Sequence, residues 1–322
     1  MKDMKKRSVF DAVCKIIAVF LLLLCMHFML RYTGYVLFPR INIIMDNGEK
    51  WSQDYGQYYF SRIPRDSLDT VFVGSSHQFC SIDPNLLNSE YGQNCALLTS
   101  SSMSMTTSYY AVMEAIELQH PKIIVLECYN TSGTNDNLIE MEKHYFLDDM
   151  PNWLLPKWKC VRETGDPPYL YYYPITAMHY RVFDLKWEDF RLPPRLKAGE
   201  RYCYHYDKTT PNEKWEEISS DRKKPMKEEI EKWLDGIVAL CRENEVELIL
   251  YVAPYFADES SQQTYNGLED YAAHNNLEYF NLMHKIDEIG LDILTDFLDD
   301  DHLNYRGQEK ITRYFGRLLL NT

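Results

Sequence analysis

Five short strand-like segments, separated by stretches with helical spacing, are the feature that most constrains the fold of this chain. These segments span residues 71–73, 94–98, 123–126, 248–252 and 278–282; the first four are mainly apolar, and the fifth also contains Glu278 and Asn281. Apolar residues recur every three or four positions over residues 111–118, 230–241 and 311–319. Continuous apolar strands that alternate with amphipathic helices are typical of a parallel sheet covered on both faces. We therefore expect an α/β fold, a three-layer αβα domain with about five parallel strands.

The N-terminal region carries a candidate membrane anchor. Residues 16–30 are apolar except for His27, and five Lys and Arg residues precede them. With the apolar residues on either side, this stretch reaches the ~20 residues that span a bilayer. No small-residue cleavage pattern follows it, so we expect an uncleaved signal anchor; a hydrophobic helix docked on the domain is the alternative. The positive flank predicts a single-pass protein with a cytoplasmic N-terminus and an extracytoplasmic main domain.

The chain is expected to have three parts and one insertion. We assign a cytoplasmic tail and transmembrane helix to residues 1–38, a juxtamembrane linker to 39–66 and the α/β domain to 67–322. Residues 131–225 have little periodicity and are rich in Tyr, Trp and Pro. Because a structureless loop of this length is improbable in a compact domain, we interpret this stretch as an inserted cap above the ligand-binding edge of the sheet. Its aromatic residues either form the insert's own core or stack on sugar rings.

Charge and cysteine spacing exclude several classes of partner. The formal net charge is -14, and the residues after Arg31 alone carry a net charge of -18. Phosphate binding requires a basic surface, so we expect no nucleic acid. The eight cysteines form no Cys-x-x-Cys pair, which argues against zinc ribbons and thioredoxin-like redox motifs. Cys160 and Cys203 lie in a loop-rich stretch and could form a disulfide.

A glycine followed by two serines ends the first apolar segment. Gly74 stands where a buried strand turns sharply into a helix, and a residue without a Cβ suits that turn. Ser76 then falls at the start of the helix, where the local dipole favours negative charge and its own N–H can bind an oxyanion. We interpret Ser76 as a candidate nucleophile; a helix N-cap is the alternative.

A carboxylate and an imidazole stand three residues apart near the C-terminus. On a helical turn, Asp299 could accept a hydrogen bond from Nδ1 of His302 and leave Nε2 free to take a proton from Ser76. These three groups are sufficient for acyl transfer through a covalent ester. A solvated acidic loop is the alternative. The acidic run lacks the spaced ligands of a calcium loop, so we expect no metal or cofactor at this site, and we expect Asn304 to cap the last helix.

Other site residues are expected where strands end, because the carboxyl ends of parallel strands meet at one edge of a sheet. The candidate oxyanion donors are the backbone N–H groups of Ser76, Thr99 and Ser100 and the side-chain amide of Asn130. Asn130 also begins an Asn-Thr-Ser glycosylation sequon and could be only a turn residue. His77 and Tyr255, which follow the first and fourth strands, are candidate substrate-binding residues; His77 could instead be a cap.

In their joint order these motifs resemble the SGNH (GDSL-like) hydrolase superfamily. The most similar branch contains membrane-anchored members typified by the D-alanyl transfer protein DltD and the alginate acetylation proteins AlgJ and AlgX. Gly74-Ser75-Ser76 stands where the family has Gly-Asp-Ser or Gly-Ser-Ser, and Asp299-x-x-His302 matches its Asp-x-x-His block, extended here through Gly307. The likeness covers residues 67–322 except for the insert.

The second and third blocks of the family differ in this chain. Asn94-Cys95-Ala96 and the serine turn look like the second block, but Thr99 replaces the usual glycine. Glu127-Cys128-Tyr129-Asn130 departs from Gly-x-Asn-Asp, so only Asn130 corresponds to a third-block residue.

The resemblance implies a flavodoxin-like domain with a specific chemistry. It implies an extracytoplasmic O-acyl transferase or esterase that acts on a cell-envelope carbohydrate or polymer through a Ser76-His302-Asp299 triad and a seryl-acyl intermediate, without a cofactor. It further suggests an acyl donor, a polymer acceptor and a multi-pass membrane O-acyltransferase as partners. Two alternatives stay open: an inactive SGNH shell that binds polymer or partners, and a membrane-anchored esterase that works alone.

Overall fold

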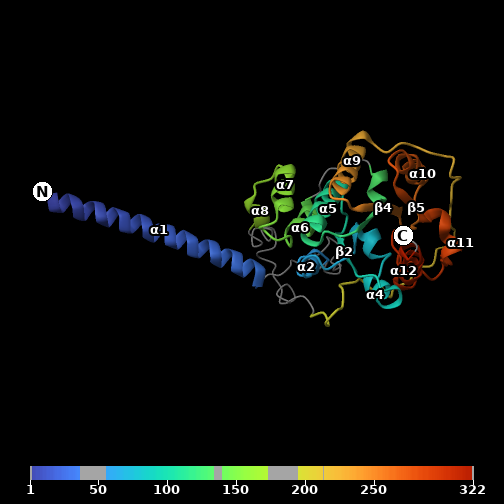
Figure 1. Cartoon of the computed structure of the whole chain (residues 1–322), viewed down its shortest axis with the longest axis horizontal. Coiled ribbons are helices and arrows are strands. Elements are labelled where there is room, and N and C mark those ends of the chain that lie inside the picture. The colour runs from blue at the N-terminus through green and yellow to red at the C-terminus, as the bar shows by residue number, and fades with distance from the viewer. Residues whose placement is uncertain (1, 37–55, 134–139, 173–194, 213, 321–322) are drawn as a thin grey trace. The chain divides into compact units, whose positions relative to one another are not determined.

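The structure is a computed structural model that describes residues 2–36, 56–133, 140–172, 195–212 and 214–320. The chain divides into two compact units, one of residues 1–53 with 166–194 and the other of residues 54–165 with 195–322. The first unit contains helices α1 (Lys2–Val36) and α8 (Tyr169–Tyr172). The second unit contains the sheet and every other element labelled in Figure 1.

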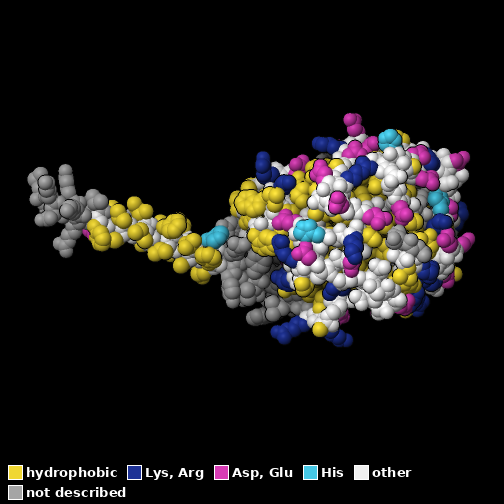
Figure 2. Space-filling model, viewed as in Figure 1, with side chains coloured by type: hydrophobic (Ala, Val, Ile, Leu, Met, Phe, Trp, Pro, Cys, Tyr) yellow, Lys and Arg dark blue, Asp and Glu magenta, His cyan; other side chains and the backbone are white. Residues whose placement is uncertain are grey.

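Helix α1 is long and apolar enough to cross a membrane. No residue of its 20-residue stretch Phe10–Met29 is buried within the protein. Apolar side chains cover the visible face of this stretch in Figure 2. A stretch of this length matches the ~30 Å hydrocarbon core of a bilayer. The predicted N-terminal apolar helix is therefore present.

The second unit is built on a sheet of five parallel strands. These are β1 (Thr70–Gly74), β2 (Cys95–Thr99), β3 (Ile123–Glu127), β4 (Glu247–Val252) and β5 (Glu278–Asn281). Their order is β2-β1-β3-β4-β5, and every neighbouring pair is parallel. This is the flavodoxin-like order, in which β1 and β3 are adjacent where the winding direction reverses. The predicted α/β class, strand number and parallel direction are confirmed.

Helices cover both faces of this sheet. On one face, α5 (Met105–Gln119) contacts β1 and β2, and α9 (Glu228–Glu243) contacts β4. On the other face, α4 (Pro84–Tyr91) contacts β2 and packs against α12 (Tyr305–Leu319). The ring of Phe315 on α12 lies 6.3 Å from that of Phe72 and 4.8 Å from that of Tyr251. Alternate strand residues thus bury side chains on opposite faces, as a sheet between two helical layers requires.

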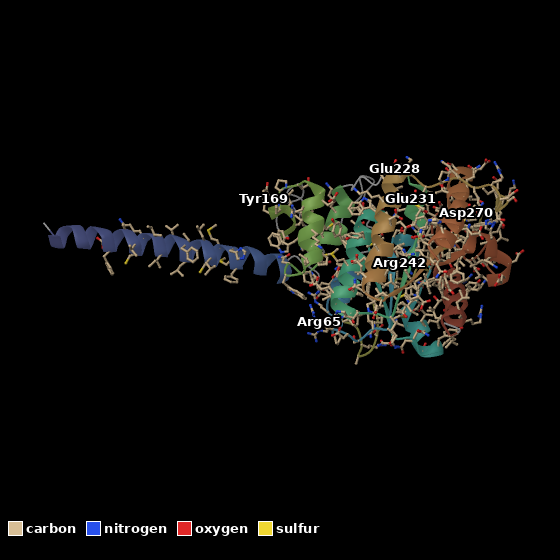
Figure 3. The ribbon with its side chains drawn as sticks, turned by 45° about the horizontal axis from the view of Figure 1, so that its top comes forward. Arg65, Tyr169, Glu228, Glu231, Arg242 and Asp270 are labelled. Carbon is tan, nitrogen blue, oxygen red and sulfur yellow. The ribbon has the colours of Figure 1, made fainter. Side chains whose placement is uncertain are left out.

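The remaining described elements are short or lie at the margins of the sheet. They are α2 (Gly56–Phe60), α3 (Ser76–Phe79), the 3-10 turns Tyr129–Ser132 and Leu282–Lys285, α6 (Glu140–Leu147), α7 (Leu155–Thr164), α10 (Glu259–His274) and α11 (Ile286–Ile289). Figure 3 shows Glu228 and Glu231 at the start of α9 and Arg242 near its end. Acidic residues at the start of a helix and a basic residue at its end interact favourably with the helix dipole.

The α/β domain begins earlier than the sequence indicated. Helix α2 lies within the range expected to be a linker, yet it packs against β2. The amide of Gln57 donates hydrogen bonds of 2.7 and 2.6 Å to the two carboxylate oxygens of Glu114, and Phe60 is buried. A helix of five residues is too short for its periodicity to be recognised in a sequence.

The described residues of the stretch interpreted as a cap, 131–225, differ in structure between its two ends, and residues 134–139, 173–194 and 213 lie outside the described residues. Helices α6 and α7 pack beside α5, where Glu142 accepts a 2.6 Å hydrogen bond from the hydroxyl of Thr107. The described residues of 195–227 form neither helix nor strand. Tyr204 in this segment is buried and stacks on Phe79 at 4.0 Å. Its tyrosines therefore belong to the core of the sheet domain and not to a separate core of an insert.

All eight cysteines lie in described segments, and all are free. Cys160 is buried on α7, whereas the thiol of Cys203 lies against the backbone carbonyl of Ile82. The possible disulfide between Cys160 and Cys203 is therefore absent from this structure.

Candidate active site

The turn after β1 presents Ser76 at the carboxyl edge of the sheet. Gly74 ends the strand, Ser75 caps α3, and Ser76 is the first residue of that helix. A Cβ added to Gly74 would lie 2.6 Å from Cβ of Glu127 and 2.9 Å from Cβ of Gln78. These contacts are too short for any side chain, so glycine is required here because β1 and β3 approach closely. Ser76 is nearly buried, with 9% of its surface exposed.

The three residues predicted to form a triad lie together. Nε2 of His302 is 2.8 Å from Oγ of Ser76, and Nδ1 of His302 is 3.0 and 3.3 Å from the two carboxylate oxygens of Asp299. When Nδ1–H donates to the carboxylate, the lone pair of Nε2 faces the serine hydroxyl. This arrangement can move a proton from Ser76 to His302 while Asp299 stabilises the imidazolium.

Asp299 and His302 lie in a non-helical loop and not on the helical turn that we expected. Residues 297–303 form a loop closed by an antiparallel bridge between Phe297 and Leu303. One oxygen of Asp299 accepts hydrogen bonds from the backbone N–H groups of Asp301 (2.9 Å) and His302 (2.8 Å). Partial burial raises the pKa of Asp299, but the bonds from His302 and the backbone outweigh it, so the net pKa lies below the usual range.

The loop is anchored on both sides. The N–H of Phe256, after β4, donates a 2.9 Å hydrogen bond to the carbonyl of Asp300. On the other side, Asn304 caps α12 as predicted, accepting from the N–H groups of Arg306 and Gly307. A Cβ on Gly307 would lie 2.5 Å from the carbonyl oxygen of Asp296, so only glycine fits where α12 meets the loop. These contacts fix the backbone that carries His302.

His77 and Tyr255 are buried next to each other and do not lie on an open surface. The ring of His77 lies 5.0 Å from that of His302, stacks on Tyr129 at 3.8 Å and meets the edge of Tyr255 at 4.9 Å. Only 4% of His77 and 5% of Tyr255 are exposed. Burial, and then the neighbouring His302, lower the pKa of His77 well below its usual value, which keeps its ring neutral. In this conformation His77 lies against His302, and Tyr255 packs against His77.

Glu127 is a residue of the site that the sequence interpretation did not identify. It ends β3, and one oxygen accepts a 2.7 Å hydrogen bond from the N–H of Tyr129 while the other accepts a 3.1 Å bond from the hydroxyl of Ser75. Burial raises the pKa of Glu127 to about 8, although these donors oppose the shift. The carboxyl group thus connects the turn that carries Ser76 to the end of the adjacent strand. An acidic residue at the end of a buried apolar strand was the available signal.

The predicted oxyanion donors are mostly engaged within the protein. The N–H of Ser100 donates a 3.3 Å hydrogen bond to the carbonyl of Gly74, and the amide of Asn130 donates to the carbonyl of Met103. The backbone N–H was the predicted donor of Thr99; its side-chain hydroxyl, a different group, is buried without a hydrogen-bond partner among the described residues. The N–H of Ser76, at the first position of α3, has no intrahelical acceptor. Of the predicted donors, Ser76 N–H is the one best placed to bind a developing oxyanion.

Comparison with known proteins does not identify this chain. No family model matches the sequence, and no curated protein matches it either.

Proposed function

We propose that this chain is a membrane-anchored serine esterase or O-acyl transferase of the SGNH type. The observation that carries the proposal is the 2.8 Å contact between Nε2 of His302 and Oγ of Ser76, with Asp299 on the other imidazole nitrogen. A serine, a histidine and a carboxylate in this order form the hydrogen-bonded relay used for nucleophilic acyl transfer. The parallel sheet supports this reading because ligands of such folds bind at the carboxyl ends of the strands.

The reaction has two balanced steps. Oγ of Ser76 attacks the carbonyl carbon of an acyl ester as His302 removes the hydroxyl proton, and the N–H of Ser76 stabilises the oxyanion. The ester bond breaks, and His302 gives its proton to the departing alcohol. In the second step, His302 removes a proton from water or from a sugar hydroxyl, which attacks the seryl ester. Ser76 is then released and takes the proton back.

The substrate and partners of this proposal follow from the anchor and from the SGNH resemblance. We place the N-terminus in the cytoplasm and the α/β domain outside, because the basic residues precede the apolar stretch. The acceptor is then a carbohydrate or polymer of the cell envelope. The acyl donor is supplied across the bilayer by a multi-pass membrane O-acyltransferase. No nucleic acid takes part, since the surface is acidic.

A second candidate is a catalytically inactive shell that binds polymer or partners. The observation that favours it is the engagement of Ser100 N–H and of the Asn130 amide by carbonyl oxygens. An enzyme that acts alone, without an acyltransferase partner, is a variant of the first candidate.

Covalent labelling with a fluorophosphonate separates these candidates. We expect the full-length protein in detergent to be labelled and to hydrolyse a simple acetyl ester, and Ser76→Ala to lose both properties. Ser89→Ala is the matched control, because Ser89 is an exposed serine on α4 whose hydroxyl donates a hydrogen bond to the carbonyl of Leu86 in the same helix. Absence of labelling in the parent protein, with the fold intact, would favour the inactive shell. Labelling that persists in Ser76→Ala would contradict the choice of nucleophile.

A further inference from the structure

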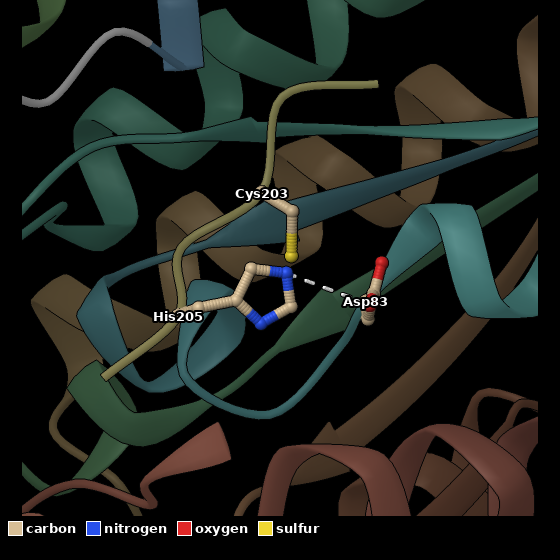
Figure 4. A group of neighbouring side chains, drawn as sticks. All are labelled: Asp83, Cys203 and His205. Atoms are coloured by element: carbon tan, nitrogen blue, oxygen red, sulfur yellow. Dashed lines mark ion pairs between the residues drawn. The ribbon is translucent and has the colours of Figure 1, made fainter. Parts of the chain in front are cut away.

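A second cluster of reactive side chains lies apart from the serine and its relay. It consists of Asp83, Cys203 and His205, whose ligand atoms all lie within 4.8 Å of one another. Figure 4 shows the side chains of Cys203 and His205 directed toward Asp83. We propose that these three residues bind a Zn²⁺ ion.

The local sequence explains how Cys203 and His205 come to face the same way. In the segment of residues 202–206, the tyrosines at every second position pack together, with ring distances of 4.9 Å from Tyr202 to Tyr204 and 6.3 Å from Tyr204 to Tyr206. All three pack against the core of the domain. The intervening residues, Cys203 and His205, are thereby placed together on the side toward Asp83. An alternation with a period of two is what an extended segment produces.

Asp83 is held in a position to offer one oxygen. It is the N-cap of α4, and its Oδ1 accepts hydrogen bonds from the N–H groups of Asn85 (2.8 Å) and Leu86 (3.3 Å). Its Oδ2 lies 3.8 Å from Nε2 of His205. One oxygen therefore fixes the carboxylate, and the other is directed to the cluster. Metal-binding carboxylates are commonly oriented by hydrogen bonds of this kind.

Burial and then the Asp83 carboxylate raise the pKa of the Cys203 thiol well above its usual value, so the thiol is protonated without a metal. The amide of Gln308 lies 3.6 Å from the sulfur but donates more closely to the carbonyls of Phe79 (2.8 Å) and Tyr204 (3.0 Å). Binding converts the thiol to a thiolate and releases its proton to solvent. The combination of sulfur, imidazole and carboxylate ligands favours Zn²⁺ over Mg²⁺ or Ca²⁺, which prefer oxygen. Water would complete the tetrahedron, and the half-exposed His205 provides access for the ion.

Such an ion would cross-link two segments of the domain. Asp83 stands seven residues after Ser76, on the segment that leads from α3 to α4. Cys203 and His205 belong to a segment without helix or strand. One Zn²⁺ ion would connect this irregular segment to the residues between α3 and α4, which follow Ser76 in the sequence. It would thus stabilise the folded protein and take no part in the acyl-transfer steps.

Metal titration of the full-length protein tests the proposal. The protein is purified in detergent with a tag that contains no histidine, stripped with a chelator and titrated with Zn²⁺ in a calorimeter. We expect one Zn²⁺ per chain, a rise in melting temperature, and a sulfur-to-metal charge-transfer band when Co²⁺ replaces Zn²⁺. Failure of the stripped protein to bind Zn²⁺ with this stoichiometry would overturn the proposal.

Variants locate the ion. We expect His205→Gln and Asp83→Asn each to weaken Zn²⁺ binding by at least about 100-fold, which is beyond the effect of losing an outer hydrogen bond. His205 is exposed, and Asn at position 83 keeps the capping oxygen, so both variants should fold. The matched control is His120→Gln, since His120 forms a 2.6 Å contact with Asp66 at another exposed site. Unchanged binding in His205→Gln, or loss of binding in His302→Gln instead, would contradict the assignment.

Discussion

Nε2 of His302 lies 2.8 Å from Oγ of Ser76, although 226 residues separate the two in the chain. The contact joins the turn after the first strand of the sheet to the loop before its last helix. It is within the range of an ordinary hydrogen bond between a hydroxyl and an imidazole. We expect activity to depend on this pair and on the groups that hold it in place.

Replacement of Asp299 tests the orientation of the imidazole. In Asp299→Asn, the side-chain amide can donate to Nδ1, which favours the tautomer with the proton on Nε2. That tautomer cannot accept the proton of Ser76. We expect kcat for an acetyl ester to fall about 10³- to 10⁴-fold, as is typical when a triad carboxylate is replaced by an amide. Steady-state hydrolysis and the rate of fluorophosphonate labelling both measure this loss.

Asp300→Asn is the control for that experiment. Asp300 is exposed and contributes to the loop through its backbone carbonyl, which the substitution leaves intact. We expect its kcat to stay within about twofold of the parent. Equal activities of the Asp299 and Asp300 variants would show that Asp299 does not orient the base.

Glu127 is expected to make stability depend on pH in a predictable direction. Its pKa rises from 4.5 to about 8 on folding, so the folded protein holds this proton more tightly than the unfolded chain does. The unfolded chain therefore binds fewer protons between pH 4.5 and about 8, and the free energy of unfolding falls as pH rises through this window. Denaturant titrations of Glu127→Gln should show a shallower fall, with a difference of a few kcal/mol across the window.

Two comparisons support that measurement. Burial also raises the pKa of Glu114 to about 8. The Glu127→Gln variant should therefore keep the part of the pH dependence of stability that Glu114 causes. Glu247→Gln, which changes an exposed residue at the start of β4, should leave the slope of the parent unchanged. A Glu127→Gln profile that runs parallel to the parent profile would mean that Glu127 does not hold a proton on folding.

Gly74 is expected to tolerate no larger residue. The Cβ of Gly74→Ala would overlap with the side chains of Glu127 and Gln78, so the strand end must shift. We expect a loss of stability of about 1–3 kcal/mol and a larger loss of kcat, because the shift moves Ser76 away from His302. Thermal unfolding and ester turnover measure the two effects.

The variant Gly92→Ala distinguishes the effect of steric crowding, expected at Gly74, from the effect of backbone strain. Gly92 has a positive φ of 67° but no heavy atom within 4 Å of an added Cβ. We expect a modest cost of about 1 kcal/mol and full activity per folded molecule. If Gly92→Ala lost as much kcat as Gly74→Ala, the close approach to Glu127 would not be the cause.

The apolar stretch of α1 is expected to integrate into a membrane. Replacing Leu21 and Leu24 with Arg places two charges near the middle of this stretch, each at a cost of about 2.5–3.5 kcal/mol for insertion. We expect alkaline carbonate to extract a large fraction of the double variant from membranes and little of the parent protein. The control replaces Leu155 and Leu294, which are exposed to a similar degree outside α1. Equal extraction of the parent and the Leu21/Leu24 variant would contradict an integral anchor.

The sequence allowed the sheet to be predicted because most of its strands are short apolar runs; β5, which contains Glu278 and Asn281, is the exception. The position of Ser76 was also predictable, since strand ends gather at one edge of a parallel sheet. Asp299 and His302 do not follow a strand, and they were recognised by their three-residue spacing and by the order of the motifs. The packing of residues 202–206 could not be predicted, because their tyrosines alternate with a period of two although the segment forms no strand. Glu127 was missed for a related reason: its role depends on the contact between β1 and β3, which strand order alone determines.

The wide separation of Ser76 and His302 has a consequence for the timing of maturation. Under the proposed acyl-transfer mechanism, a chain that is still emerging from the ribosome or the translocon carries the hydroxyl group of Ser76 early but receives the proposed base 226 positions later. Until the loop that carries His302 docks, the proposed nucleophile would lack its base, so partly synthesised copies would not modify esters at the wrong place or time. Onset of turnover is then a direct reporter of completed folding.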